Sequence, residues 1–386
     1  MSHMKIEEVK IKNIIRKYKK PINIYSKKKI LNNIKIIKKF KKIIFFYAVK
    51  ANDNKEILKI IKKKMNFETV SIGETEKVLS TKVKPEKIIF SGIGKSKREI
   101  YKTLKYNVKK FNIESLQELK RIIKISKINK KIAEIFIRIN LEIDCKSNKK
   151  ISTGKKNSKF GLNLEEAIKA KKIIKKNKNS AILLGIGFHL GSQITKSIYY
   201  INAIKKLMKF KKKHFKKIKF INLGGGIGIN YNKSNYKRNV KIKKNILKKI
   251  SLIIKRYKTI KVIMELGRSI IADTCFTLFK VEYVKRNFII TDLGINNIIR
   301  QILYKSYHKI KNLKKYKNLK KYNIVGPICE CSDILAKNKL FFAKKNDFLI
   351  IKDTGAYCYS MSSNYNSQPR AKQILISKKT ITILNK

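Results

Sequence analysis

The chain has 386 residues, of which 43% are hydrophobic, so it is long enough to form two or three domains with sizeable cores. Lysine and arginine number 96 against 24 aspartates and glutamates, which gives a net charge of +72. Lysine is spread along the whole sequence without a distinct basic patch, and no nucleic-acid recognition motif accompanies it. A biased genome composition therefore explains the charge better than specific nucleic-acid binding, and non-specific attraction to polyanions is expected as a side effect.

Several other classes of protein are excluded by the same inspection. No uninterrupted apolar run reaches the length of a membrane-spanning helix, and the N-terminal residues lack the apolar core of a signal peptide. Five cysteines are an odd and sparse number, which argues against a disulfide framework. Cys329 and Cys331 form a C-x-C pair without a second pair, so no metal site is expected. A cytoplasmic location is the expectation for such a chain.

The first 270 residues contain eight short apolar runs, separated by lysine-rich stretches such as 55–64 and 194–213 that have helical spacing. Eight strands that alternate with helices predict an α/β fold, a closed (β/α)8 TIM barrel. The alternative, an open doubly wound sheet, would need a G-x-G-x-x-G motif after the first strand, and none is present. The predicted strands cover residues 43–49, 67–72, 88–90, 108–113, 132–139, 182–188, 218–223 and 262–264.

After about residue 270 the pattern changes to strands joined by short turns, which predicts an all-β domain, either a sandwich or an open barrel. We therefore expect a barrel domain over residues 26–270 and a β domain over 271–386, with residues 1–25 adding to the second. The strands predicted in this domain cover residues 272–284, 288–291, 322–325, 339–343, 347–352 and 374–384.

The ends of the predicted barrel strands carry a distinctive set of residues, and this is the edge at which barrel enzymes place their chemistry. Lys50 follows six apolar residues, where an amine would be costly to desolvate and its pKa would fall. It is either one more solvated lysine or a Schiff-base nucleophile. Glu265 ends the eighth strand and is either a salt-bridge partner or a hydrogen-bond acceptor for a protonated pyridine nitrogen. His189 is either structural or stacked on a planar ring.

Glycines end the seventh predicted strand and precede a predicted helix. Gly224, Gly225 and Gly226 either form a tight turn or let backbone amides approach a phosphate, and Gly267 with Arg268 offers a second phosphate contact. A buried amine, a phosphate cradle, a carboxylate and a partner for a flat ring are together what pyridoxal phosphate requires.

Four of these segments resemble the fold-type III decarboxylases of basic amino acids: FYAVKAN at 46–52, FHLGSQI at 188–194, GGGIG at 224–228 and ELGR at 265–268. Three segments of the C-terminal half are similar to the diaminopimelate decarboxylase family. They are NNIIRQILY at 296–304, GPICECSD at 326–333 and GAYCYSMSSNYNSQPR at 355–370. The resemblance runs from about residue 20 to the end. Leu266, Cys331, Cys358 and Gln368 depart from the family pattern, at positions with no chemical role.

The resemblance implies a role for each matched residue. Lys50 would hold pyridoxal 5′-phosphate as a Schiff base, His189 would stack on its ring and Glu265 would bind the ring nitrogen. Cys329, from the other subunit of a head-to-tail homodimer with shared active sites, would donate a proton. Gly226 and the loop of Gly267 and Arg268, helped by Tyr365, would hold the phosphate, and Ser192 and Gly225 are further implied cofactor-binding residues. Those implied to bind the substrate are Arg268, Arg300, Tyr304, Glu330 and Tyr365.

The expected reaction is the decarboxylation of meso-2,6-diaminopimelate to L-lysine and carbon dioxide, the last step of lysine biosynthesis. A guanidinium grips a carboxylate with two hydrogen bonds, so the arginines favour a substrate with a second amino-acid end over ornithine or arginine. The alternatives are a related decarboxylase, acting on carboxynorspermidine, ornithine or arginine, and a pyridoxal phosphate-binding protein without catalysis.

Overall fold

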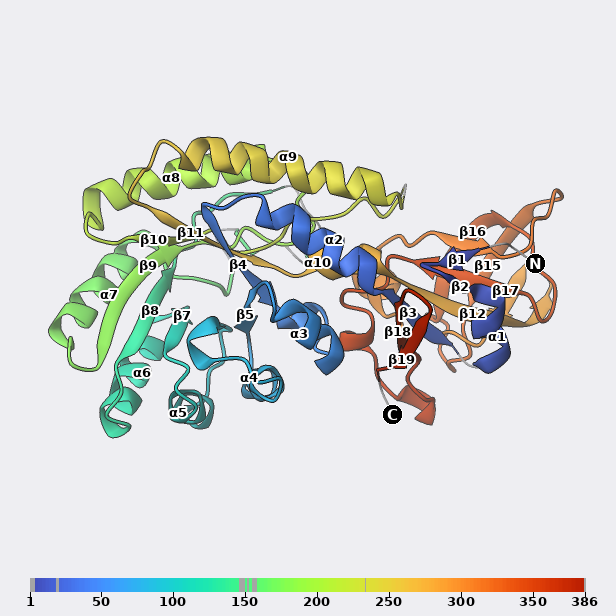
Figure 1. Cartoon of the computed structure of the whole chain (residues 1–386), viewed down its shortest axis with the longest axis horizontal. Coiled ribbons are helices and arrows are strands. Elements are labelled where there is room, and N and C mark those ends of the chain that lie inside the picture. The colour runs from blue at the N-terminus through green and yellow to red at the C-terminus, as the bar shows by residue number, and fades with distance from the viewer. Residues whose placement is uncertain are drawn as a thin grey trace. The chain divides into compact units, whose positions relative to one another are not determined.

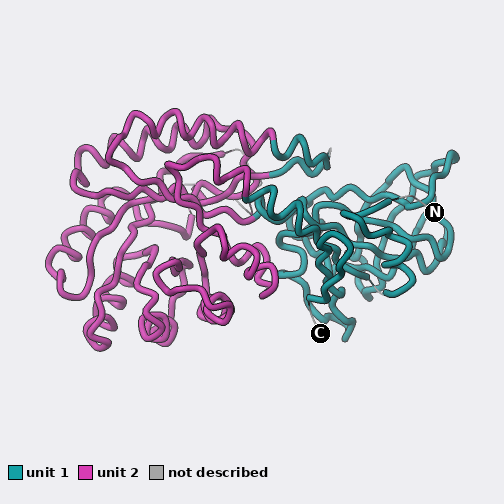
Figure 2. Tube along the Cα trace, viewed as in Figure 1, with its two compact units in different colours: residues 1–34, 229–240, 268–386 teal, residues 35–228, 241–267 magenta. Residues whose placement is uncertain are grey.

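The computed structural model describes residues 4–18, 21–145, 150, 153–154, 158–232 and 234–384. The chain forms two compact units, and it leaves and re-enters both of them (Figure 2). One unit, here called the barrel unit, comprises residues 35–228 and 241–267. The other, here called the β unit, comprises residues 1–34, 229–240 and 268–386. None of the described helices combines the length and the apolar character needed to cross a membrane.

The barrel unit contains eight parallel strands that follow one another around a closed barrel, which confirms the predicted fold class (Figure 1). The last strand pairs with the first, with Glu265 beside Phe46, and this pairing closes the barrel. The strand residues are buried almost throughout, as expected for a parallel sheet that is covered on both faces. The strands are β4 (Ile43–Ala48), β5 (Asn66–Thr69), β6 (Ile88–Phe90), β7 (Lys110–Ile113), β8 (Ala133–Arg138), β9 (Ala181–Gly187), β10 (Phe220–Asn222) and β11 (Lys261–Leu266).

Helices follow the barrel strands, and polar caps set where several of them begin. The side chains of Ser71, Ser96, Ser115 and Asn163 each accept a hydrogen bond from a first-turn amide. The predicted second strand, 67–72, is therefore too long, because Ser71 already caps a helix that begins at Ile72. Helix α2 (Lys27–Lys38) precedes β4. The helices between the barrel strands are α3 (Lys55–Ile61), α4 (Ile72–Leu79), α5 (Lys97–Lys105), α6 (Leu116–Ile128), α7 (Leu164–Lys176), α8 (Ile198–His214) and α9 (Tyr236–Ile254).

The β unit is built on a nine-stranded mixed sheet to which both ends of the chain contribute. The early strand β3 pairs in parallel with β18 and antiparallel with β12, so residues 22–26 lie between two C-terminal strands. The predicted strand 374–384 is in fact two antiparallel strands, β18 and β19, joined by a turn. The strands are β3 (Ile22–Ser26), β12 (Cys275–Lys285), β13 (Phe288–Thr291), β14 (Ile310–Asn312), β15 (Lys320–Val325), β16 (Ile334–Phe341), β17 (Phe348–Lys352), β18 (Lys372–Ser377) and β19 (Thr380–Ile383).

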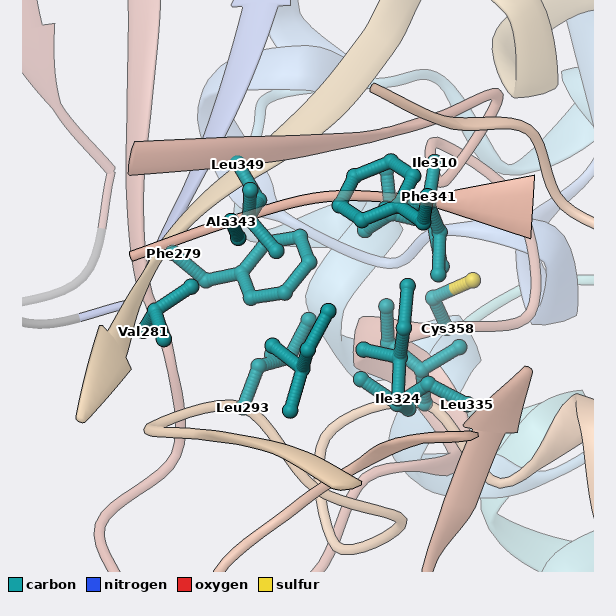
Figure 3. Close-up of a cluster of buried hydrophobic side chains, with 13 residues drawn as sticks. Phe279, Val281, Leu293, Ile310, Ile324, Leu335, Phe341, Ala343, Leu349 and Cys358 are labelled. Carbon is teal, nitrogen blue, oxygen red and sulfur yellow. The ribbon is translucent and has the colours of Figure 1, made fainter. Parts of the chain in front are cut away.

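A hydrophobic core fills the β unit between its strands (Figure 3). The rings of Phe279 and Phe341 pack there among aliphatic side chains, and Cys358 lies in the same cluster as a small apolar residue. A second cluster joins the short N-terminal elements β1 (Lys5–Ile6), β2 (Val9–Lys10) and α1 (Ile11–Lys17) to β3 and β18.

The barrel interior is also packed. Phe46, Ile89, Phe136 and Ile263 come from four strands and form one buried cluster inside it. The barrel is therefore closed by side chains below the ends of its strands, and any ligand site on its axis has to lie above them.

Candidate active site

A cavity of about 330 Å³ lies in the barrel unit, where the carboxyl ends of the strands meet. This is the edge at which a (β/α)8 barrel builds its active site. All eight strands, or the residues just after them, contribute to its wall. The lining residues are Lys50, Glu68, Val70, Ser91, Gly92, Ile93, Asn112, Glu114, Arg138, Thr153, Lys159, Phe160, Gly187, Phe188, His189, Asn222 and Glu265.

Lys50 lies in a short 3-10 turn, Val49–Ala51, directly after β4. Its Nζ is 3.1 Å from both carboxylate oxygens of Glu68, a residue of β5 that is 2% exposed. The Lys50 side chain is 39% exposed. The prediction of a desolvated amine is therefore wrong for this structure, because Lys50 has an ion-pair partner and reaches solvent through the cavity.

Glu265 belongs to β11, the strand that pairs with β4. Its Oε1 accepts hydrogen bonds from the side-chain amides of Asn112, at 2.9 Å, and Asn222, at 2.6 Å. Burial, and next the negative charge of Glu68, raise the pKa of Glu265 to about 7. Both amides bind Oε1, so Oε2 is the oxygen that Glu265 can present to a ligand in the cavity.

His189 follows β9, and its ring lines the cavity. Its Nδ1 accepts a hydrogen bond from the backbone amide of Gly225 at 3.0 Å, so the neutral ring carries its proton on Nε2. Burial, and next the positive charges of Arg138 and Lys50, lower the pKa of His189 well below its usual value. The structure thus holds a neutral imidazole at this wall.

The three glycines after β10 form a loop that passes very close to other backbone. A Cβ on Gly225 would lie 2.0 Å from the carbonyl oxygen of Glu265, and one on Gly226 would lie 2.1 Å from that of Gly191. Gly226 also has a φ of +95°, which favours glycine. The predicted helix does not follow this loop, because α9 begins only at Tyr236. Any anion held here would thus be bound by loop amides, without a helix N-terminus.

Two of the three backbone amides of this loop already donate hydrogen bonds to described residues, and the third does not. Gly224 donates to the Oδ1 of Asn222 at 2.9 Å, and Gly225 donates to His189. Within the part of the chain that the structure describes, the Gly226 amide donates to no other group. Ser192 lies half-buried in the loop after β9, and Gly267 follows β11 directly. These are the residues of the barrel unit that the sequence suggested for binding the cofactor, and their role stays a prediction.

The remaining predicted residues belong to the β unit. Arg268 begins α10 (Arg268–Ile271), and its Nη1 donates to the hydroxyl of Tyr231 at 2.7 Å. Arg300 and Tyr304 are the first and last residues of α11 (Arg300–Tyr304). The guanidinium of Arg300 stacks on the same Tyr231 ring, with its Cζ 4.8 Å from the ring centroid.

Three other predicted residues come together on loops of the β unit. The hydroxyl of Tyr365 donates to Oε1 of Glu330 at 2.7 Å. The backbone amide of Cys329, the neighbour of Glu330, donates to Oδ1 of Asn366 at 2.8 Å. The Cys329 thiol itself is exposed, as is that of Cys331.

Sequence reasoning missed the polar residues inside the strands. Glu68, Asn112 and Asn222 surround Lys50 and Glu265, and each stands among apolar neighbours in a short strand. That position was the available signal, because a buried polar group in a strand needs a partner. Arg138 was also missed; its Nη1 donates to Oε1 of Glu114 at 2.7 Å on the same wall.

Comparisons with known proteins agree with this arrangement. A sequence profile described as "Pyridoxal-dependent decarboxylase, pyridoxal binding domain" matches residues 28–272. Diaminopimelate decarboxylase of Haemophilus influenzae is 36% identical over 340 residues, which are 86% of this chain and 81% of that protein. The enzyme of Aquifex aeolicus is 33% identical over 393 residues, 99% of this chain and 92% of that protein. A crystal structure of the Helicobacter pylori enzyme complexed with L-lysine superposes with a TM-score of 0.88 at 33% identity, covering 97% of this chain and 96% of that one. The chain therefore belongs to the diaminopimelate decarboxylase family of the pyridoxal-dependent decarboxylases.

Proposed function

We propose that this protein removes one carboxyl group of meso-2,6-diaminopimelate, giving L-lysine and carbon dioxide, with pyridoxal 5′-phosphate bound at the barrel cavity. The observation that carries the proposal is the convergence of Lys50, His189 and Glu265 on one cavity, in a chain of the diaminopimelate decarboxylase family. When bound, the cofactor supplies an aldehyde for the amine and a ring that accepts the electrons left by carbon dioxide.

The barrel residues fit such a cofactor. Lys50 would hold it covalently through Nζ, and the neutral face of His189 would pack on its ring. Glu265 presents Oε2 to the cavity and has a pKa near neutrality, so it can share a proton with a ring nitrogen. Gly226 has an amide available for a phosphate oxygen, and its missing Cβ leaves room for close approach. Ser192, Gly225 and Gly267 are proposed to hold the phosphate with it.

The resemblance assigns the remaining roles to residues of the β unit. Arg268 and Tyr365 are proposed as further phosphate ligands and, with Tyr304 and Glu330, as substrate ligands. Arg300 would bind the carboxylate of the amino-acid end that stays intact, as a guanidinium suits a carboxylate. The loss of carbon dioxide leaves an electron pair on the α-carbon, and a proton from the Sγ of Cys329 would complete the reaction there.

The proposal includes the state of the protein in the cell. Cys329 would reach the site from the second subunit of a head-to-tail homodimer. The enzyme would work in the cytoplasm, where a reducing environment keeps that exposed cysteine as a thiol.

The test begins with the visible spectrum of the purified protein with pyridoxal phosphate, followed by product analysis with meso-diaminopimelate, carboxynorspermidine and ornithine. We expect lysine from the first substrate and little product from the others. Lys50→Ala should abolish both the cofactor absorbance and lysine release. Lys55→Ala, which changes an exposed lysine at the start of α3, should preserve both. A full cofactor spectrum in Lys50→Ala, or amine release in preference to lysine release, would overturn the proposal.

A further inference from the structure

Arg300 is a buried cation whose partner is neutral. The residue is 3% exposed, and no ion pair of the described residues includes it. Its Nη1 lies 2.5 Å from the Nε2 of His308, and its Nε is buried without a hydrogen-bond partner. A buried guanidinium that is not matched by a carboxylate is costly, so an anion that contacts Arg300 would relieve this cost.

The hydrogen bonds determine the tautomer of His308. Arginine only donates and does not lose its proton in proteins, so Nε2 of His308 must accept from Nη1. The proton of the imidazole is then on Nδ1, which donates to the backbone carbonyl of Lys352 at 2.8 Å. Burial, and next the charge of Arg300, lower the pKa of His308 to about 3. His308 is therefore an uncharged acceptor at neutral pH.

An uncharged acceptor has a different effect on Arg300 than a carboxylate would have. It fixes the direction of one N–H group and leaves the positive charge of the guanidinium uncancelled. The ring of Tyr231 supports the same arrangement, with Arg300 stacked on it at 4.8 Å and the ring of His308 against it at 4.8 Å between centroids. Arg268 binds the hydroxyl of the same tyrosine, so a second positive charge is nearby.

We propose that His308 is a positioning residue that orients Arg300 for the carboxylate retained in lysine, while leaving the charge of Arg300 available to that carboxylate. This inference deepens the proposed function and rests on it. It makes His308 a determinant of specificity, because a diamine that lacks the carboxylate gains nothing from an oriented guanidinium.

Two ligands and two variants test this role. L-lysine and cadaverine differ by the carboxylate in question, and their affinities for the holoenzyme can be measured by calorimetry without turnover. His308→Asn can keep a donor near the position of Nδ1 but has no acceptor at the position of Nε2. His308→Gln places a neutral acceptor near Nε2. We expect the L-lysine affinity to fall about ten-fold in His308→Asn and to stay within about three-fold in His308→Gln, since a hydrogen bond to a charged group contributes at this level. Cadaverine affinity should change less than about two-fold in both variants.

A third variant separates orientation from charge. His308→Glu keeps an acceptor but adds the negative charge that His308 lacks, so L-lysine should bind at least about ten-fold more weakly while cadaverine binds at least as well as before. The same variant should raise the KM for diaminopimelate more than it lowers kcat. His214→Gln, which changes a histidine at the end of α8 in the barrel unit, is the matched control and should leave every value unchanged.

The outcomes are distinguishable. Equal losses for L-lysine and cadaverine, or unchanged L-lysine binding in both His308→Asn and His308→Glu, would overturn the role of His308. If His308→Asn does not fold, the comparison of His308→Gln with His308→Glu decides alone. A wild-type protein that binds L-lysine but releases none from diaminopimelate would contradict the proposed function and leave the His308 measurements valid. A wild-type protein that does not bind L-lysine would overturn both.

Discussion

Replacement of Glu265 by glutamine tests whether the site sacrifices stability for function. In the cofactor-free protein, burial and the charge of Glu68 raise the pKa of Glu265 from 4.5 to about 7. A carboxyl group with a raised pKa binds a proton more tightly in the folded state than in the unfolded state. Its contribution to stability is therefore complete below pH 4.5 and is lost as the pH rises through 7. At about 1.4 kcal/mol per pH unit, the loss amounts to about 3 kcal/mol at pH 8.

Glu265→Gln should remove this loss. A glutamine is neutral at every pH, and its Oε1 can still accept from the amides of Asn112 and Asn222. We expect the cofactor-free variant to be up to about 3 kcal/mol more stable than wild type at pH 8, with a melting temperature higher by about 6–12 °C. The difference should shrink to nothing below about pH 5. In the holoenzyme the same change should slow lysine release by about 10²–10³-fold, because the ring nitrogen would lose the charged partner that we propose for it.

The assay is urea and thermal unfolding of the cofactor-free protein between pH 5 and pH 8.5. Glu165→Gln removes the same charge from an exposed position in the first turn of α7, so it controls for the large net charge of the chain. That control should change stability by less than about 1 kcal/mol at every pH. A Glu265→Gln variant that is no more stable than wild type at pH 8, or equally favoured at pH 5, would refute the reasoning.

Two further predictions concern the packing around the site. Lys95→Met should destabilise the barrel by about 3–5 kcal/mol in thermal unfolding. The buried Nζ of Lys95 lies 2.6 Å from Glu118 and 2.7 Å from the carbonyl of Asn112, and methionine removes both contacts. A loss of stability below about 1 kcal/mol would mean that water replaces the ammonium. Gly226→Ala should weaken pyridoxal phosphate binding at least ten-fold in a spectroscopic titration, because the new Cβ would lie 2.1 Å from the carbonyl oxygen of Gly191. An unchanged affinity would mean that this loop does not bind the phosphate.

The barrel was predictable because each of its strands is an apolar run bounded by polar residues. Strands that depend on distant partners were harder to find. Residues 1–25 were expected to add to the β domain, but the strand β3, at 22–26, was not identified, because its partners lie near residues 276 and 374. The end of β5 was missed for a local reason, because Ser71 and Glu74 form a cap that stops the strand before Ile72.

The candidate site was predictable only at the strand ends. Lys50, His189 and Glu265 stood out because a reactive group after a buried strand is unusual. Glu68 and Asn222 did not stand out, because the function of one polar residue in a short strand cannot be inferred until its neighbour across the barrel is known. The ion pair of Lys50 with Glu68 also shows why the desolvation argument failed: burial of a strand end does not say which charge lies beside it.

The pairing of β11 with β4 has a consequence for biosynthesis. Lys50 leaves the ribosome early, whereas Glu265, which pairs with Phe46 just before that lysine, emerges some two hundred residues later. Under the proposed function, a nascent or truncated chain that stops before β11 carries the lysine that would hold the cofactor but lacks Glu265. On that proposal, capture of vitamin B6 would require the ring of strands to be closed, and an unfinished polypeptide would not hold the coenzyme in a complete site.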